Sequence, residues 1–184
     1  VAFLDELLAT PGLKPTVISF NTAMAALGSV GQWERAWQLL GSMRSHGLTP
    51  DAASFSAAIR ACGRASHWQG ALELLDELCQ DPANPATSNV PFNCAITALA
   101  NGGQWQRAVG LLERMHQHRN PAVAPDLISY NAAIHSTRHA KEWEAALGLL
   151  EQMRVNGIEP DRISYNTAMA VCAKAGQWHE ALRL

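Results

Sequence analysis

Residues 127–161 read LISYNAAIHSTRHAKEWEAALGLLEQMRVNGIEPD and contain one complete copy of a unit that recurs along the chain. Each copy has a tryptophan followed three positions later by an alanine; these tryptophans are Trp33, Trp68, Trp105, Trp143 and Trp178. Successive tryptophans are 35, 37, 38 and 35 residues apart. Self-similarity at this period indicates a stack of small units, each of which packs mainly against its neighbours.

Two helical patterns occur in each unit. The first follows the i, i+3, i+4 and i+7 spacing of one helical stripe, as in Leu127, Tyr130, Asn131 and Ile134. The second begins at the tryptophan and continues through Ala, Leu and Met. A glycine at position 31, 103 or 176 predicts a left-handed residue that ends the first helix. The exits Gly47–Asp51 and Gly157–Asp161 combine a glycine, a proline and an N-capping aspartate. The chain is therefore expected to be all-α, built from antiparallel helix pairs.

This register divides the 184 residues into one array. Residues 1–16 are expected to be the tail of a preceding repeat, and the following segments are repeats one to five: 17–51, 52–88, 89–126, 127–161 and the truncated 162–184. Loop insertions at 81–85 and 116–121 account for the two longer repeats. We expect the chain to be an interior stretch of a longer array.

The composition of the chain argues against several classes of function. The chain has 14 Lys and Arg against 16 Asp and Glu, a net charge of −2, which argues against tight non-specific nucleic-acid binding. No apolar run has the roughly 18 to 20 residues of a membrane span. The four cysteines have no CxxC spacing, so we interpret each as a buried, reduced thiol.

The aromatic–asparagine pairs, the period and the Gly-x-x-Pro-Asp exit together resemble the pentatricopeptide repeat family over essentially the whole chain; the pairs are Phe20-Asn21, Phe92-Asn93, Tyr130-Asn131 and Tyr165-Asn166. Tetratricopeptide repeats have 34 residues and a different signature. The resemblance implies a right-handed α-solenoid (superhelix) that binds single-stranded RNA at one nucleotide per repeat. It also implies a mitochondrial or chloroplast location.

By the same resemblance, two side chains in each repeat select the base. The first selectors are Asn21, Ser56, Asn93, Asn131 and Asn166, and the second selectors are Asp51, Ser88, Asp126 and Asp161. Asn with Asp is similar to the family's uracil-reading combination, so repeats one, three and four are expected to read uracil. Repeat two is left unassigned, and Asn166 alone suggests a pyrimidine in repeat five.

Two further sets complete the expected RNA site. The family clamps each base between residues near the start of successive first helices, which here are Ile18, Val90, Ile128 and Ile163, while Ala53 departs from the aliphatic pattern. Phosphate contacts are expected from the last turn of the first helices, at Arg64, Arg138 and Lys174. Since backbone contacts supply much of nucleic-acid affinity, so few cations predict weak binding by this segment or a contribution from other repeats.

Simpler roles compete with these assignments. An aspartate between a proline and a helix is also an N-cap, worth about 1 kcal/mol, so capping alone is an alternative for the second selectors. Asn is a poorer helix former than Ala by roughly half a kcal/mol. It nevertheless recurs as the first selector in four of the five repeats, while the residue after it varies, which indicates that the function requires its side-chain amide. The tryptophans lie on the packing stripe, which predicts that they fill space between repeats rather than stack on bases.

No catalytic or metal chemistry is indicated. His135 and His139 have an i, i+4 spacing but no third ligand, and no nucleophile, base and orienting acid recur together. We therefore expect no enzyme activity, cofactor, metal or small-molecule substrate. Two alternatives to RNA reading stay open: a scaffold that docks proteins or ribosomal RNA in a large organellar ribonucleoprotein, and an RNA-processing factor whose catalytic domain lies after Leu184.

Overall fold

The computed structural model describes residues 16–80 and 88–184, which fold into helices without any strand in those two ranges. The predicted tail at 1–16, apart from Thr16, and the predicted insertion at 81–85 lie outside the described residues. The second predicted insertion is described: α7 extends through His116, and a short 3₁₀ turn, η1 (Pro121–Val123), follows it. Val123, just after the insertion, is buried in the hydrophobic core.

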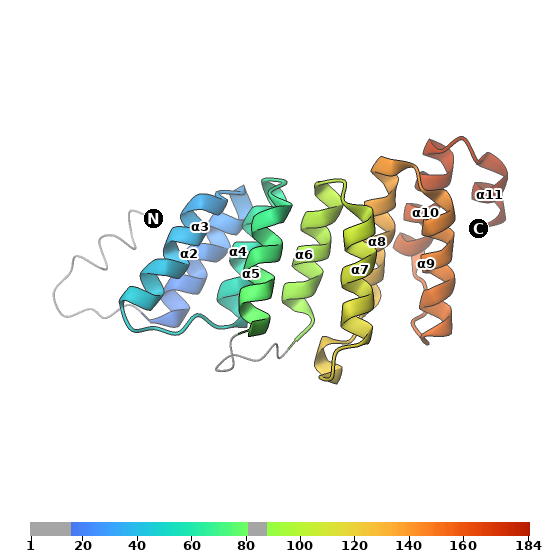
Figure 1. Ribbon diagram of the computed structural model, residues 1–184. Coiled ribbons are helices and arrows are strands. Elements are labelled where there is room, and N and C mark those ends of the chain that lie inside the picture. The colour runs from blue at the N-terminus through green and yellow to red at the C-terminus, as the bar shows by residue number, and fades with distance from the viewer. Residues whose placement is uncertain (1–15, 81–87) are drawn as a thin grey trace.

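First and second helices of the repeats alternate along the chain. The first helices, called A helices below, are α2 (Val17–Val30), α4 (Ala52–Arg64), α6 (Val90–Asn101), α8 (Leu127–Ala140) and α10 (Arg162–Lys174). The second helices, called B helices, are α3 (Trp33–Ser45), α5 (Trp68–Gln80), α7 (Trp105–His116), α9 (Trp143–Val155) and α11 (Trp178–Arg183). Figure 1 shows them side by side in chain order, from α2 at one end to α11 at the other. The predicted all-α stack of helix pairs is confirmed.

Most A helices begin with a reciprocal capping box. In α8 the Asp126 carboxylate accepts from the Ser129 N–H at 2.9 Å, and Ser129 Oγ accepts from the Asp126 N–H at 3.1 Å. The same arrangement starts α2, α4 and α10, where the paired residues are Thr16–Ser19, Asp51–Ser54 and Asp161–Ser164. Each box satisfies two amides that a helix start leaves free. The predicted capping role of these aspartates is therefore present.

The turns from A to B helices use left-handed residues, as the glycines predicted. Gly31, Gly103 and Gly176 have φ of 73°, 69° and 79°. At the equivalent place Ser66 and Lys141 take φ of 56° and 61°, a conformation that is strained for residues with a Cβ. The fold therefore imposes this turn even where the sequence lacks glycine.

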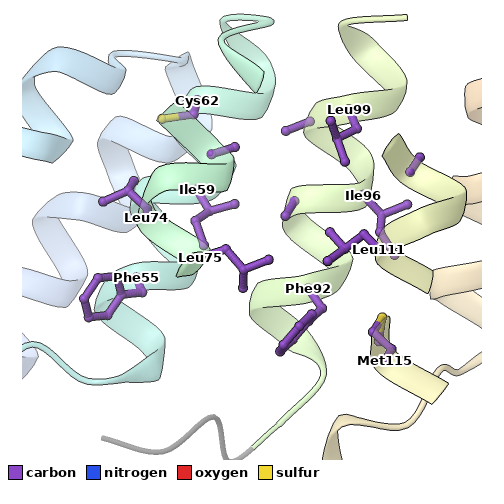
Figure 2. Close-up of a cluster of buried hydrophobic side chains, with 14 of the residues drawn as sticks. Phe55, Ile59, Cys62, Leu74, Leu75, Phe92, Ile96, Leu99, Leu111 and Met115 are labelled. Carbon is purple, nitrogen blue, oxygen red and sulfur yellow. The ribbon is translucent and has the colours of Figure 1, made fainter. Parts of the chain in front are cut away.

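The core runs continuously between the two helix layers. The aromatic residue in the first turn of α2, α4, α6 and α8 is fully buried, and these residues are Phe20, Phe55, Phe92 and Tyr130, whereas Tyr165 of α10 is half-buried. Figure 2 shows the buried side chains of α4, α5, α6 and α7 directed into the space between these helices. Each A helix contacts the A helices before and after it and the two neighbouring B helices. Burial of this interface is the main source of stability in a repeat array.

Trp33 and Trp68 contact the next repeat, as predicted, and the first four tryptophans of the series are half-buried. The Trp33 ring stacks on His67 with centroids 4.1 Å apart, and the Arg107 guanidinium lies over Trp68 at 4.5 Å. A Cβ on Gly102 would lie only 2.4 Å from Trp68, so this turn also needs glycine for the tryptophan to pack. Trp178, which no later repeat in the chain can cover, is 58% exposed.

The cysteine interpretation holds only in part. Cys62 and Cys172 are buried, Cys94 is half-buried and Cys79 is exposed, so burial was the wrong prediction for Cys79. Burial raises the pKa of the Cys62 thiol to about 11, which keeps it protonated. In the described part of the chain, no helix is both long and apolar enough to cross a membrane.

The A helices pack closely on one another. A Cβ on Gly63 of α4 would lie 3.2 Å from the Ala98 Cβ of α6, and one on Gly28 of α2 would lie 2.9 Å from the Ala57 carbonyl oxygen. Neighbouring B helices instead reach each other with long side chains, through Arg44–Glu77 and Arg114–Asp76. The A layer therefore has the shorter spacing between repeats, and it brings side chains from successive A helices together on one surface.

Candidate nucleic-acid interface

Four predicted clamp residues are exposed on the A layer. Ile18, Val90, Ile128 and Ile163 are 76%, 50%, 62% and 57% exposed, and each lies one position before a buried or capping residue of its helix. They account for four of the nine large hydrophobic side chains exposed among the described residues. Exposed aliphatic groups at one repeated position are suited to contact an apolar ligand surface, such as the face of a base. Ala53 is exposed at the same position but offers only a methyl group.

The first and second selectors meet directly in three repeats. The amide nitrogen of Asn93 donates to Asp126 Oδ1 at 3.2 Å, that of Asn21 to Asp51 Oδ1 at 3.0 Å, and that of Asn131 to Asp161 Oδ1 at 3.3 Å. The members of each pair are at least 30 residues apart in sequence. These are the repeats with the Asn and Asp combination, so the structure brings the predicted pairs together.

A serine joins each pair. The hydroxyl of Ser129 donates to Asn93 Oδ1 at 2.5 Å, that of Ser54 to Asn21 Oδ1 at 2.5 Å, and that of Ser164 to Asn131 Oδ1 at 2.6 Å. These are the same serines that complete the capping boxes of the following A helices. Sequence reasoning missed them as site residues, although a serine three positions after each capping aspartate was a visible signal.

Hydrogen bonds keep these carboxylates ionised. Partial burial alone would raise the pKa of Asp126, but bonds from Ser129, Asn93 and Asn89 outweigh it and lower the pKa below the ordinary aspartate value. Asp51 shows the same balance: burial opposes bonds from Ser54 and Asn21, and the net effect lowers its pKa. For Asp161 the Ser164 N–H is the largest cause of a lowered pKa. Each carboxylate therefore carries its charge at neutral pH.

Repeat two does not form the corresponding pair. Ser56 Oγ donates to the Ala52 carbonyl of its own helix at 2.6 Å, and it is not hydrogen-bonded to Ser88. At the start of α6, Pro91 also occupies the place of the capping-box serine. Asn89 is itself helical, with φ −79° and ψ −8°, and its amide donates to Asp126 Oδ2 at 2.8 Å.

A pocket of about 510 Å³ opens between repeats two and three. It lies between the clamp residues Val90 and Ile128, and the selector Asn93 and the predicted phosphate contact Arg64 also line it. The pocket therefore combines members of all three predicted sets from neighbouring A helices. Its size is within the range of small-ligand sites.

Five pocket-lining residues were not predicted: Arg60, Gly63, Cys94, Thr97 and Asn101. Arg60 lies four residues, or about one helical turn, after Ser56, so helix periodicity could have identified it. Burial raises the pKa of Cys94, with Arg60 acting in the opposite direction, so its thiol remains neutral. Arg60 and Arg64 give this pocket two cations in successive turns of α4.

A second pocket of about 260 Å³ lies between repeats four and five. It is lined by the clamp residue Ile163, the selector Asn166, the predicted phosphate contact Arg138 and His135. Asn166 is exposed, and no A helix follows α11 in the given chain to bring a second selector next to it. The remaining phosphate candidate, Lys174, is exposed at the end of α10 and lines neither pocket.

The described ranges contain no candidate metal site. No group of three or more His, Cys, Asp and Glu side chains there is placed to hold an ion. Burial, followed by the nearby charges of Arg138 and His139, lowers the pKa of His135, so its imidazole is neutral at pH 7. His135 is therefore a polar, uncharged lining residue of the smaller pocket.

Comparison with protein-family models decides the family. The model of the PPR repeat family matches residues 15–64 and 125–174, and the PPR repeat model matches residues 53–81 and 90–120. The chain belongs to the pentatricopeptide repeat family. The resemblance drawn from the aromatic–asparagine pairs and the Gly-x-x-Pro-Asp exit is confirmed.

Solved pentatricopeptide repeat structures share this fold. The crystal structure of PPR10 from maize is 29% identical, with a TM-score of 0.74, and the match covers 94% of this chain and 24% of PPR10. PPR10 in complex with an 18-nt psaJ RNA element is 27% identical, with a TM-score of 0.79, and covers 99% of this chain and 26% of PPR10. These matches confirm the predicted right-handed α-solenoid. The chain spans about a quarter of the length of PPR10.

A more distant match extends the fold comparison. The PPR domain of Arabidopsis thaliana protein-only RNase P 1, solved in complex with tRNA, is 14% identical with a TM-score of 0.67. It covers 88% of this chain and 84% of that domain, and at this identity it supports the fold alone. No match was found among curated protein sequences.

Proposed function

We propose that the A-layer surface of this pentatricopeptide repeat array binds single-stranded RNA and prefers uracil-containing sequences. The observation that carries this proposal is the pocket between Val90 and Ile128, where a selecting amide and an arginine lie between two exposed aliphatic side chains. Aliphatic groups on either side suit the two faces of a base, the amide suits its edge, and the cation suits the adjoining phosphate. PPR10, which has the same fold, was crystallised with RNA.

The selector pairs support the pyrimidine preference. Repeats one, three and four carry an Asn in contact with an ionised Asp, the combination that resembles the family's uracil reader. Repeat two lacks the pair, so it contributes contacts from Arg60 and Arg64 rather than base choice. This proposed role is binding without catalysis, in a mitochondrion or chloroplast, and it needs no cofactor.

Fluorescence anisotropy with labelled oligonucleotides tests the base preference. We expect tighter binding to U-rich than to A-rich RNA, and we expect Asn93→Ala combined with Asn131→Ala to remove most of that difference. Each lost amide contact should weaken binding about fivefold. Gln152→Ala, which changes an exposed amide on α9, is the matched control and should bind like the wild type. Equal or absent binding to all oligonucleotides would contradict the proposal and favour the scaffold role.

Salt dependence tests the phosphate contacts separately. Each neutralised phosphate of a single strand contributes about −0.7 to the slope of log K against log salt. Arg64→Gln with Arg138→Gln should therefore make the slope shallower by about 1.4 while leaving the U-over-A ratio unchanged. An unchanged slope would show that these two arginines do not contact the RNA backbone.

A further inference from the structure

The three-residue clusters Asn93–Asp126–Ser129, Asn21–Asp51–Ser54 and Asn131–Asp161–Ser164 connect each selecting asparagine to the start of the next repeat. A side-chain amide can rotate by 180° and so exchange its donor and acceptor ends. What fixes this rotation decides which base the amide can recognise.

Both ends of the Asn93 amide are constrained. An ionised carboxylate can only accept hydrogen bonds, so Asp126 requires the nitrogen end to face it, at 3.2 Å. Ser129 Oγ already accepts from the Asp126 N–H at 3.1 Å, and its hydroxyl lies 2.5 Å from Asn93 Oδ1 and 3.0 Å from Asp126 Oδ1. Asp126 Oδ1 already accepts from the Ser129 N–H and the Asn93 amide, so the shorter bond, to Asn93 Oδ1, is the one that the hydroxyl proton satisfies best. Asn93 is only 8% exposed, which further restricts its motion. One amide N–H and one oxygen lone pair remain for a ligand, in a fixed order.

A fixed order matters because the two pyrimidines present opposite patterns. Uracil offers an acceptor oxygen next to its N3–H donor, whereas cytosine offers an amino donor next to an acceptor nitrogen. A freely rotating amide could satisfy either base by turning over. An amide held in one orientation fits one of them and leaves unpaired groups against the other.

We infer that Ser54, Ser129 and Ser164 are positioning residues for base selection: each fixes the selecting asparagine of the preceding repeat and so sets uracil against cytosine. This inference rests on the proposed RNA-binding function. The specificity of one repeat then depends on a residue of the next. Among the four complete repeats, repeat two is the exception, because Pro91 stands where the serine would be and Ser56 bonds to its own helix.

The loss-of-function test uses Ser129→Ala with oligo-U and a set of oligonucleotides that each carry one cytosine. We expect the affinity of the variant for oligo-U to stay within about twofold of the wild type. We expect its U-over-C affinity ratio to fall about fivefold at the position that repeat three reads. Ser129→Thr, which keeps the hydroxyl, should restore the ratio. Ser19→Ala is the matched control, since Ser19 completes the Thr16 capping box without contacting a selecting asparagine in the described chain.

The gain-of-function test uses repeat two. Ser56→Asn with Ser88→Asp installs the selector pair alone, and adding Pro91→Ser also installs the positioning serine. We expect the triple variant to discriminate uracil from cytosine at one additional position about fivefold better than the double variant. This comparison does not depend on weakening a native helix cap.

The outcomes separate the inference from the function it rests on. The positioning role alone is overturned if Ser129→Ala binds RNA normally and its U-over-C ratio is unchanged. It is also overturned if the double and triple variants of repeat two show the same U-over-C ratio. A Ser19→Ala variant that loses selectivity as Ser129→Ala does would also overturn it, because the effect would then come from capping. Absence of RNA binding by the wild-type chain overturns both proposals.

Discussion

At the residue scale, the aspartates before the A helices have two structural roles. Asp126 caps α8 through the Ser129 N–H and also holds the Asn93 amide of the preceding repeat. Capping alone, which the sequence left open, accounts for the position of the carboxylate but not for this second contact. The lowered pKa of Asp126 reflects both, because burial is outweighed by bonds from the helix amide and from the side chains of Ser129, Asn93 and Asn89.

This lowered pKa predicts an acid-dependent loss of stability. A carboxylate whose pKa is lower in the folded state stabilises the fold above its ordinary value of 3.8, and this contribution disappears as pH falls through the folded pKa. Asp126→Asn keeps an acceptor but removes the charge. Thermal unfolding followed by circular dichroism should therefore give a higher melting temperature for the wild type than for the variant at neutral pH. The difference in melting temperature should disappear as the pH falls below 3.8. Glu159→Gln, at an exposed loop position, is the control and should show no such closing.

At the element scale, the left-handed turn is required by the A-to-B connection rather than by the residue that occupies it. Lys141 ends α8 with φ 61°, and its N–H bonds to the Thr137 carbonyl as a glycine would. Gly103 has φ 69° at the equivalent turn, with no heavy atom near enough to contact an added Cβ. Only backbone conformation therefore distinguishes the two residues at these positions.

Reciprocal substitutions measure that difference. Lys141→Gly should raise the free energy of unfolding by about 0.5 to 1 kcal/mol, because relief of the left-handed strain exceeds the added entropy of glycine in the unfolded chain. Gly103→Ala should lower it by about 1 kcal/mol. Urea denaturation followed by circular dichroism measures both. Effects of the same sign would show that side-chain contacts, and not φ, determine stability at this turn.

At the scale of the whole molecule, the spacing of the A layer brings the site together. Gly63 allows α4 and α6 to approach until an added Cβ would lie 3.2 Å from Ala98 Cβ. The amide of Asn101 crosses the same interface and donates to the Gly63 carbonyl at 2.9 Å. The larger pocket is lined by residues of both helices and of α8, so its dimensions follow from these contacts.

Widening this interface should affect stability and binding together. Gly63→Val places branched carbons against Ala98 and should cost about 1 to 3 kcal/mol of unfolding free energy by overpacking. Because Gly63 also lines the larger pocket, RNA affinity should fall as well. Gly148→Val on α9, where an added Cβ meets nothing within 4 Å, is the control and should be neutral or slightly stabilising in urea denaturation. Wild-type stability and binding in Gly63→Val would show that the two A helices can separate without cost.

The sequence by itself determined the helices, their order and the repeating unit, because these depend on local signals. Left-handed glycines, capping aspartates and the 3.6-residue apolar period act within a few residues of the backbone they control. The same register placed the selectors and the clamp residues at equivalent helix positions. The family of the chain could be predicted from those positions alone.

Only the tertiary structure decided which of these residues meet. Ser129 and Asn93 are 36 residues apart, and their contact exists because α6 and α8 pack side by side at a fixed spacing. Distances between helices also decide three other findings. They are the missing contact between Ser56 and Ser88, the partial exposure of the tryptophans and the position of Arg60 in the lining of the larger pocket. A local pattern specifies the face on which a side chain lies, whereas its partner is set by the packing of the next repeat.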